Sequence, residues 1–163
     1  MKVQCCYRDL SQLFSYPEAL PDKELMFRAG VLEANLPDIR ELQSQYVRLF
    51  INALPQVPCP PYGSIYLEGS CMGETTVTVR SIYRKYGFET DEMPDHIAVE
   101  LEFLDYLKQA GQSEEIADSD FVFLLTHLKS WAPAFFERVE KNDKNGFYRA
   151  VAQGAKNILL KGG

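Results

Sequence analysis

The chain has 163 residues, of which 46% are hydrophobic and 12% are aromatic. A chain of this length and composition is expected to form one domain over residues 1–163 that buries roughly 70% of its accessible surface, which excludes a disordered chain, a collagen-like repeat and a disulfide-stabilised miniprotein. The formal net charge is −6, from 17 basic and 23 acidic residues, and this acidity argues against a general nucleic-acid-binding protein.

Three short helices are predicted in the first third of the chain. Apolar residues at helical spacing predict the first over residues 7–16, where the following proline ends it. A second helix over residues 22–32 begins at Asp22, a good N-cap, and a third over residues 37–51 begins at Pro37, a good first-turn residue. The residues of the third helix expected to face the core are Ile39, Leu42, Tyr46, Leu49 and Phe50.

Residues 55–63 interrupt this helical pattern with four prolines and one glycine in nine positions. Such a stretch forms neither an interior helix nor a central strand. The 54 residues before it are few for an independent domain, and the composition does not change after it. We therefore interpret the stretch as an ordered loop that crosses one domain, rather than as a linker between two domains.

Residues 75–80, Thr-Thr-Val-Thr-Val-Arg, alternate as a β-strand would. The apolar residues that follow are nevertheless spaced as in a helix, and Gly87 stands where a helix C-terminal cap is expected. Because no second strand is available to pair with this segment, we predict a helix here.

Four further helices are predicted, over residues 94–110, from 118 or 119 to 131, over 133–139 and over 146–160. Pro133 is expected to separate the second of these helices from the third. The chain then contains about seven or eight helices and no convincing sheet, so the predicted fold class is an all-α helical bundle.

Two residues of the helix predicted over residues 94–110 are candidates for a functional site. His96 and Glu100 fall on its apolar side and, as i and i+4 neighbours, their side chains can meet. Asp95 falls on the opposite, polar side, where a carboxylate in the first turn also compensates the helix dipole. The pair forms either a buried structural contact or the floor of a binding site.

A second candidate segment is residues 60–66, Pro-Pro-Tyr-Gly-Ser-Ile-Tyr. Its prolines restrict the backbone, and Tyr62 and Tyr66, on either side of Ser64, present flat apolar rings with polar tips. This composition is typical of the wall of a peptide-binding groove. A well-packed loop that covers a core explains the same composition.

Motifs for nucleophilic catalysis, phosphate binding and dinucleotide binding do not occur, so no enzyme activity is expected. The cysteines lack the spacing of a zinc or redox site, and His96 and His127 lie far apart, so no metal and no other cofactor is expected. The first thirteen residues lack a signal-peptide pattern and no apolar run reaches the length of a membrane span, which predicts a cytoplasmic protein without integral membrane association.

Taken in order along the chain, several motifs resemble those of the TorD/DmsD/NarJ family of redox-enzyme maturation chaperones. The resemblance spans about residues 40–107, and the C-terminal region is compatible with it. The motifs are Tyr46-Val47-Arg48-Leu49-Phe50, Pro60-Pro61-Tyr62-Gly63-Ser64-Ile65-Tyr66, Tyr83-x-x-Tyr86-Gly87-Phe88, and Pro94-Asp95-His96-Ile97 with Glu100-Leu101.

The resemblance implies an all-helical cytoplasmic chaperone without catalytic activity. Its partner would be the twin-arginine signal peptide, or the apo form, of a molybdopterin-containing oxidoreductase subunit, held back from export until the cofactor is inserted. The peptide-binding residues implied in this chain are Tyr62, Ser64, Tyr66, Asp95, His96 and Glu100. Tyr62 stands where many members have tryptophan, and it keeps a smaller stacking face.

Two other functions are compatible with the residues themselves: a structural helical subunit of a larger complex, and a helical protein that binds a small molecule or nucleotide. The absence of a glycine-rich phosphate loop argues against the nucleotide. Both a monomer and a homodimer are compatible with the sequence.

Overall fold

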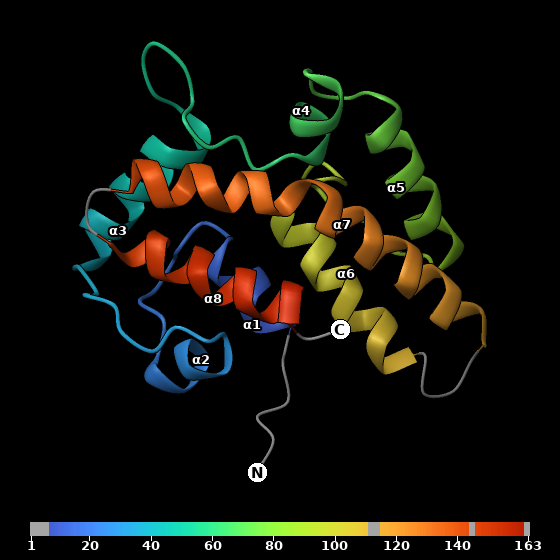
Figure 1. Ribbon diagram of the computed structural model, residues 1–163, viewed down its shortest axis with the longest axis horizontal. Helices are drawn as coiled ribbons and strands as arrows, with labels where there is room; N and C mark the ends of the chain where they lie inside the picture. The colour runs from blue at the N-terminus through green and yellow to red at the C-terminus, as the bar shows by residue number, and fades with distance from the viewer. Residues whose placement is uncertain (1–6, 111–114, 144–145, 162–163) are drawn as a thin grey trace.

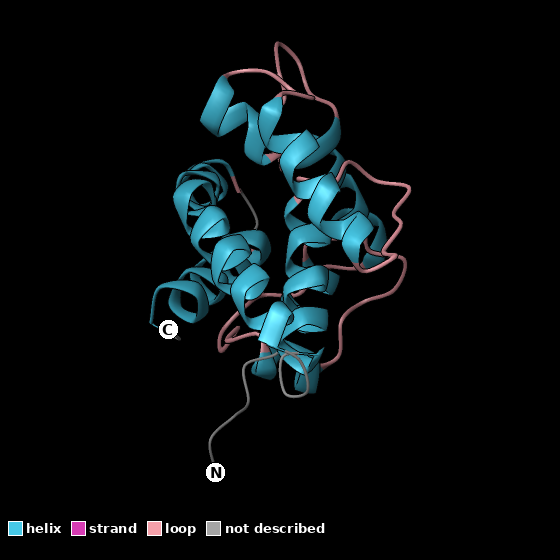
Figure 2. Cartoon of the chain, turned by 90° about the vertical axis from the view of Figure 1, so that its right-hand side faces the viewer, coloured by secondary structure: helices cyan, strands magenta, loops and turns pink. Residues whose placement is uncertain are grey.

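The computed structural model describes residues 7–110, 115–143 and 146–161 (Figure 1). Within these ranges the chain forms eight α-helices and one π-helical turn but no strand, which confirms the all-α prediction (Figure 2). The elements are α1 (Tyr7–Leu13), α2 (Lys23–Arg28), α3 (Ile39–Tyr46), the π-helical turn η1 (Val47–Ile51), α4 (Gly63–Glu68), α5 (Glu74–Lys85), α6 (Ile97–Ala110), α7 (Glu115–Asn142) and α8 (Phe147–Lys161).

The core is built around α7, the longest helix, which packs against α6 on one side and α8 on another (Figure 1). Helix α1 packs mainly on α6 and also touches α8, so the two ends of the described chain share one core. Phe14, directly after α1, stacks on Phe136 of α7 with ring centroids 5.8 Å apart. Helix α4 packs on α7 and on α5, and so joins the smaller helices to this core.

Helix α5 confirms the choice of helix over strand for residues 75–80. Its buried residues are Thr76, Val79, Ile82 and Tyr83, which lie on one face at helical spacing. Val77, which the strand alternation would have buried together with Val79, is 63% exposed. Burial of the i, i+3, i+7 stripe outweighs the β-propensity of the threonines and valines.

Three predictions about the helices were wrong. The second helix ends at Arg28 instead of residue 32, because Gly30 turns the chain with a φ of +76°. A short helix, α4, follows directly after the proline-rich loop, where none was predicted. Helix α7 runs unbroken through Pro133, since burial of the aromatic rings on both sides of this residue offsets the lost backbone hydrogen bond.

Smaller shifts occur at four other boundaries. Helix α1 ends at Leu13 instead of residue 16, and α3 begins at Ile39, two residues later than predicted. Helix α6 begins at Ile97, three residues later than predicted, and α7 begins at Glu115, three or four residues earlier. Gly111, which directly follows the helix predicted over residues 94–110, lies outside the described residues. Among the helices of the described ranges, none is both long and apolar enough to cross a membrane.

Candidate functional site

The proline-rich segment and the segment before α6 pair with each other as a two-residue antiparallel bridge. Tyr62 and His96 form the bridge, with the Ile97 N–H donating to the Pro61 carbonyl at 2.8 Å and the Gly63 N–H donating to the Asp95 carbonyl at 3.0 Å. Pro61 lacks an N–H, so its carbonyl is the one backbone group it can contribute. Two motifs more than thirty residues apart thus form one structural unit.

Asp95 is fully buried, and its carboxylate joins α4 to α5. One oxygen accepts the Ser64 N–H at 2.8 Å, and the other accepts the Thr76 hydroxyl at 3.2 Å. The first bond satisfies an N–H in the first turn of α4, where no preceding backbone carbonyl can reach. The prediction that Asp95 lies on an outer polar side of its helix was therefore wrong, because the residue precedes α6 and faces α4 and α5.

His96 caps the start of α6. Its Nδ1 accepts the Ala98 N–H at 3.0 Å, and its ring meets the Tyr62 ring edge-on with centroids 5.3 Å apart. Burial lowers the pKa of this histidine to about 4. The imidazole is neutral at pH 7, with its proton on Nε2.

Glu100 is buried as predicted, but its partners lie on α7 and not at His96. Trp131 Nε1 donates to one carboxylate oxygen at 3.0 Å, and His127 Nε2 lies 2.6 Å from the other. The proposed His96–Glu100 contact was wrong, because α7 packs directly over this turn of α6 and brings two donors to the carboxylate. Burial raises the pKa of Glu100 to about 7, and the Glu100 carboxylate outweighs burial to raise the pKa of His127.

The remaining predicted residues lie behind this unit rather than beside Tyr62. Tyr66 stacks on Trp131 with centroids 5.6 Å apart, and the Arg138 guanidinium lies 4.8 Å from the centre of the Tyr66 ring. The hydroxyls of Ser64 and Tyr66 are buried, and neither has a hydrogen-bond partner in the described parts of the chain. A side chain at Gly63 would place its Cβ 2.8 Å from Trp131 Nε1, so the close approach requires glycine.

Tyr62 and His96 line a cavity of about 380 Å³ in front of this unit. Its walls combine the aromatic rings of Tyr16, Tyr46 and Phe50 with the carboxylates of Asp91, Glu92 and Glu102. No lysine or arginine is among the described residues that line it. The Tyr62 hydroxyl lies 3.4 Å from a Glu92 oxygen, and burial together with this carboxylate raises the pKa of Tyr62 to about 12. The arrangement suits a ligand that is cationic and partly apolar.

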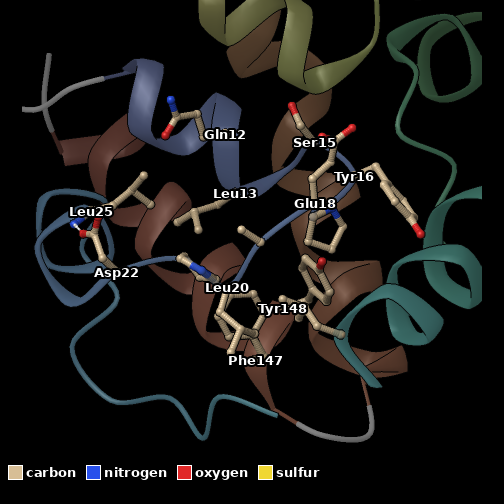
Figure 3. A pocket seen from close by; sticks show the side chains of 14 residues that line it. Gln12, Leu13, Ser15, Tyr16, Glu18, Leu20, Asp22, Leu25, Phe147 and Tyr148 are labelled. Carbon is tan, nitrogen blue, oxygen red and sulfur yellow. Dashed lines mark hydrogen bonds between the residues drawn. The ribbon is translucent and has the colours of Figure 1, made fainter. Parts of the chain in front are cut away.

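A second cavity, of about 230 Å³, adjoins the first one at Ser15 and Tyr16, which line both (Figure 3). Leu20 and Leu25 close it from the segment around the start of α2, and Phe147 and Tyr148 form its wall from α8 (Figure 3). Most of its lining side chains are apolar or aromatic, so the second cavity offers apolar surface next to the acidic one.

Sequence reasoning missed three residues that build the site: Thr76, His127 and Trp131. His127 and Trp131 are i and i+4 on the helix predicted from residue 118 or 119 to 131, next to the apolar residues that face the core. This spacing places an imidazole and an indole N–H on a buried face, which signals a buried acceptor elsewhere in the chain. The sequence did not show that the acceptor is Glu100.

The chain is similar to a group of related proteins. A profile of the family described as the nitrate reductase delta subunit matches residues 17–137. The chaperone protein TorD of Vibrio parahaemolyticus serotype O3:K6 is 30% identical over 126 residues, which are 69% of this chain and 58% of that relative. The TorD chaperone of Aliivibrio fischeri is 36% identical over 104 residues, which are 56% of this chain and 48% of that relative.

The chain therefore spans about half the length of the curated relatives it matches. Among solved structures, a proposed redox enzyme maturation protein from Archaeoglobus fulgidus has a similar fold, with a TM-score of 0.71 and 32% sequence identity. This similarity covers 94% of the present chain and 91% of the archaeal one.

Proposed function

Because the chain belongs to the nitrate reductase delta subunit family, the TorD/NarJ group of redox-enzyme maturation chaperones, we propose that it is a maturation chaperone for a molybdopterin-containing oxidoreductase. Its ligand is the twin-arginine signal peptide, or the N-terminal segment, of that enzyme's apo subunit. The chaperone acts in the cytoplasm, where it delays export until the cofactor is inserted.

The observation that carries this proposal is the acidic and aromatic cavity beside Tyr62 and His96. A twin-arginine peptide offers two guanidinium groups followed by an apolar stretch. The exposed carboxylates of Asp91 and Glu92 lie at this cavity, and a carboxylate can accept two parallel bonds from one arginine. The ring of Tyr62 provides a flat face over which a guanidinium can stack.

The six residues proposed for peptide binding divide into two roles. Tyr62 and His96 contact the peptide, because both line the cavity. Asp95 and Ser64 fix the backbone that carries Tyr62, whereas Glu100 and Tyr66 support it from below through Trp131. The last four residues are therefore positioning residues.

The apolar stretch of the peptide follows the rings of Tyr16 and Tyr46 and enters the adjoining cavity beneath Leu20. This path differs from the apolar wall of Ile65 and Tyr66 that the sequence suggested, because Tyr66 faces Trp131 and Arg138. Binding and release require no covalent step, so the function needs no catalytic residue.

Isothermal titration with two peptides tests the proposal. We expect a peptide with an Arg-Arg pair and an apolar stretch to bind more tightly than its Lys-Lys counterpart, because lysine cannot form the bidentate contact. Glu92→Gln should weaken binding of the Arg-Arg peptide about fivefold, in the range of one exposed charged contact. Glu89→Gln, which removes the same charge outside the cavity, should leave the affinity unchanged.

Added salt should reduce the affinity of the Arg-Arg peptide for the acidic cavity but not the part contributed by the apolar stretch. Equal affinities for the two peptides, with no dependence on salt or on Glu92, would contradict the proposed role of the acidic cavity.

A further inference from the structure

A groove of opposite charge lies on the other side of the proline-rich segment. Its volume is about 860 Å³, and Arg48, Arg138 and Lys141 line it together with residues 53–58. None of its described lining residues is an aspartate or glutamate, although the whole chain carries a net charge of −6. Residues 60–65 therefore separate an acidic cavity from a basic groove.

Two of the three cations of this groove are held in place without being neutralised. Arg48 bonds the side-chain oxygen of Gln45 and lies 3.4 Å from the Asn142 carbonyl, and Arg138 lies over the ring of Tyr66. Neither of these two cations, nor Lys141, forms an ion pair with a carboxylate of the described residues. Two guanidinium groups positioned by neutral partners retain their charge for a ligand.

Apolar surface accompanies the charge. Leu54, on the loop that forms one wall, is 96% exposed, and the side chains of Val57 and Ile65 line the groove beside it. A fully exposed leucine next to three cations fits a ligand that combines carboxylates with at least one apolar side chain.

We propose that this groove binds an acidic segment of a protein partner, whose carboxylates meet Arg48, Arg138 and Lys141 and whose apolar side chain packs on Leu54. The site is separate from the acidic cavity and goes beyond the function proposed above. Its test uses no arginine peptide, so either proposal can fail without the other.

The probe is a fluorescein-labelled peptide with alternating pairs of glutamate and leucine, compared with the same peptide carrying glutamine in place of glutamate. In fluorescence anisotropy we expect the acidic peptide to bind and the neutral peptide to bind at least fivefold more weakly, as expected for the loss of exposed charged contacts. Amide chemical shifts should change at Leu54, Gln56 and Val57 and around Lys141, and not around Tyr62.

Lys141→Glu should weaken binding of the acidic peptide about tenfold, because it replaces attraction by repulsion. Lys141 has no hydrogen bond or ion pair to other described residues, but it lies in the last turn of α7, where the helix dipole favours a cation. Its replacement by glutamate should therefore lower the thermal midpoint by no more than about 4 °C. Lys129→Glu is the matched control, since Lys129 lies on the same helix outside the groove and should change the affinity less than twofold. Lys141→Arg should restore binding.

Four outcomes would overturn the proposal. Equal loss of binding in Lys129→Glu would show that the peptide responds only to the net charge of the protein. Equal binding of the glutamine peptide would show that the three cations of the groove make no contact that contributes to the affinity. Displacement of the peptide by inorganic phosphate, but not by sodium chloride at the same ionic strength, would assign the groove to a small anion. A dimer in light scattering that Lys141→Glu dissociates would make a second copy of this chain the occupant.

Discussion

The buried imidazole of His96 makes the start of α6 sensitive to acid. Its Nδ1 must stay unprotonated to accept the Ala98 N–H, and burial lowers its pKa from 6.5 to about 4. A group whose folded-state pKa is lowered contributes stability that is present above its unfolded pKa and is lost as the pH falls through the folded pKa. The sensitive range is therefore between pH 6.5 and 4.

We expect the free energy of unfolding of the wild-type protein to fall by roughly 2–3 kcal/mol more than that of His96→Asn between pH 7 and pH 4.5. The asparagine side-chain oxygen can cap the same N–H but does not titrate. Urea denaturation at both pH values measures the difference. Parallel losses in the two proteins would show that the imidazole does not titrate in this range.

Gly63 and Ser64 are neighbours in the chain, but their replacement by alanine should have very different effects on the free energy of unfolding. The new Cβ at Gly63 would lie 2.8 Å from Trp131 Nε1, and forcing such a contact into a packed core costs about 1–3 kcal/mol. The Ser64 hydroxyl is buried without a partner in the described residues, so Ser64→Ala should change stability by less than about 0.5 kcal/mol. Chemical denaturation of the two variants tests this contrast, and a costly Ser64→Ala would indicate a partner for the hydroxyl.

At the scale of elements, the contact of Glu100 with His127 joins α6 to α7 and is sensitive to base. The contacting oxygen and nitrogen lie 2.6 Å apart, and the pKa values of both groups are raised, so the pair keeps one proton to higher pH than a free histidine does. Because the unfolded chain loses this proton near pH 6.5, the contact contributes stability at or below that pH. This contribution is lost as the pH rises.

The double variant Glu100→Gln/His127→Gln should therefore flatten the decrease in stability between pH 6.5 and pH 8.5, because neither amide titrates and an amide N–H can still donate to an amide oxygen. His127→Gln alone would leave Glu100, whose pKa burial raises to about 7, to titrate in this range. Urea denaturation at three pH values across this range measures the two slopes. A wild-type stability that stays constant or rises with pH would contradict the shared proton.

Elements with strong periodicity could be predicted from the sequence, and elements that depend on distant partners could not. The helical spacing of Val79, Ile82 and Tyr83 identified α5 despite its β-branched residues. Helix α4 was missed, because its first turn is completed by Asp95 from a segment thirty residues later. Pro133 led to the prediction of a break in α7, which the structure does not show. The buried aromatic rings that offset the cost of this proline pack against other helices, and that packing cannot be recognised from the local sequence.

The same distinction applies to the candidate site. The sequence singled out Tyr62 and His96, because proline, aromatic and histidine residues in those motifs are recognisable locally. The two residues contact each other in the structure, and their role in peptide binding stays a prediction. The sequence placed Glu100 beside His96, although the carboxylate binds across to α7. The partner of a buried carboxylate depends on how α6 packs against α7. The spacing of residues along α6 alone gives no information about that packing.

At the scale of the whole molecule, the first and last helices of the described residues share one core. Leu10 of α1 is fully buried, α1 packs on both α6 and α8, and the carbonyl of Phe14 accepts the Tyr46 hydroxyl at 2.7 Å. We propose that residues 1–163 form one domain that unfolds cooperatively, because separate units would not share these buried contacts.

Leu10→Ala tests this proposal, since the substitution lies near the N-terminus and its effect should spread to the whole protein. Removing a fully buried leucine side chain costs about 2–5 kcal/mol, and in a protein of this size each kcal/mol lowers the thermal midpoint by roughly 2–4 °C. Far-UV and near-UV circular dichroism should report the same lowered midpoint. Leu32→Ala, at a position that is 75% exposed, should leave the midpoint nearly unchanged. A Leu10→Ala protein that loses part of its helical signal early, while the aromatic signal of α7 and α8 melts at the wild-type temperature, would show that the chain consists of two independent folding units.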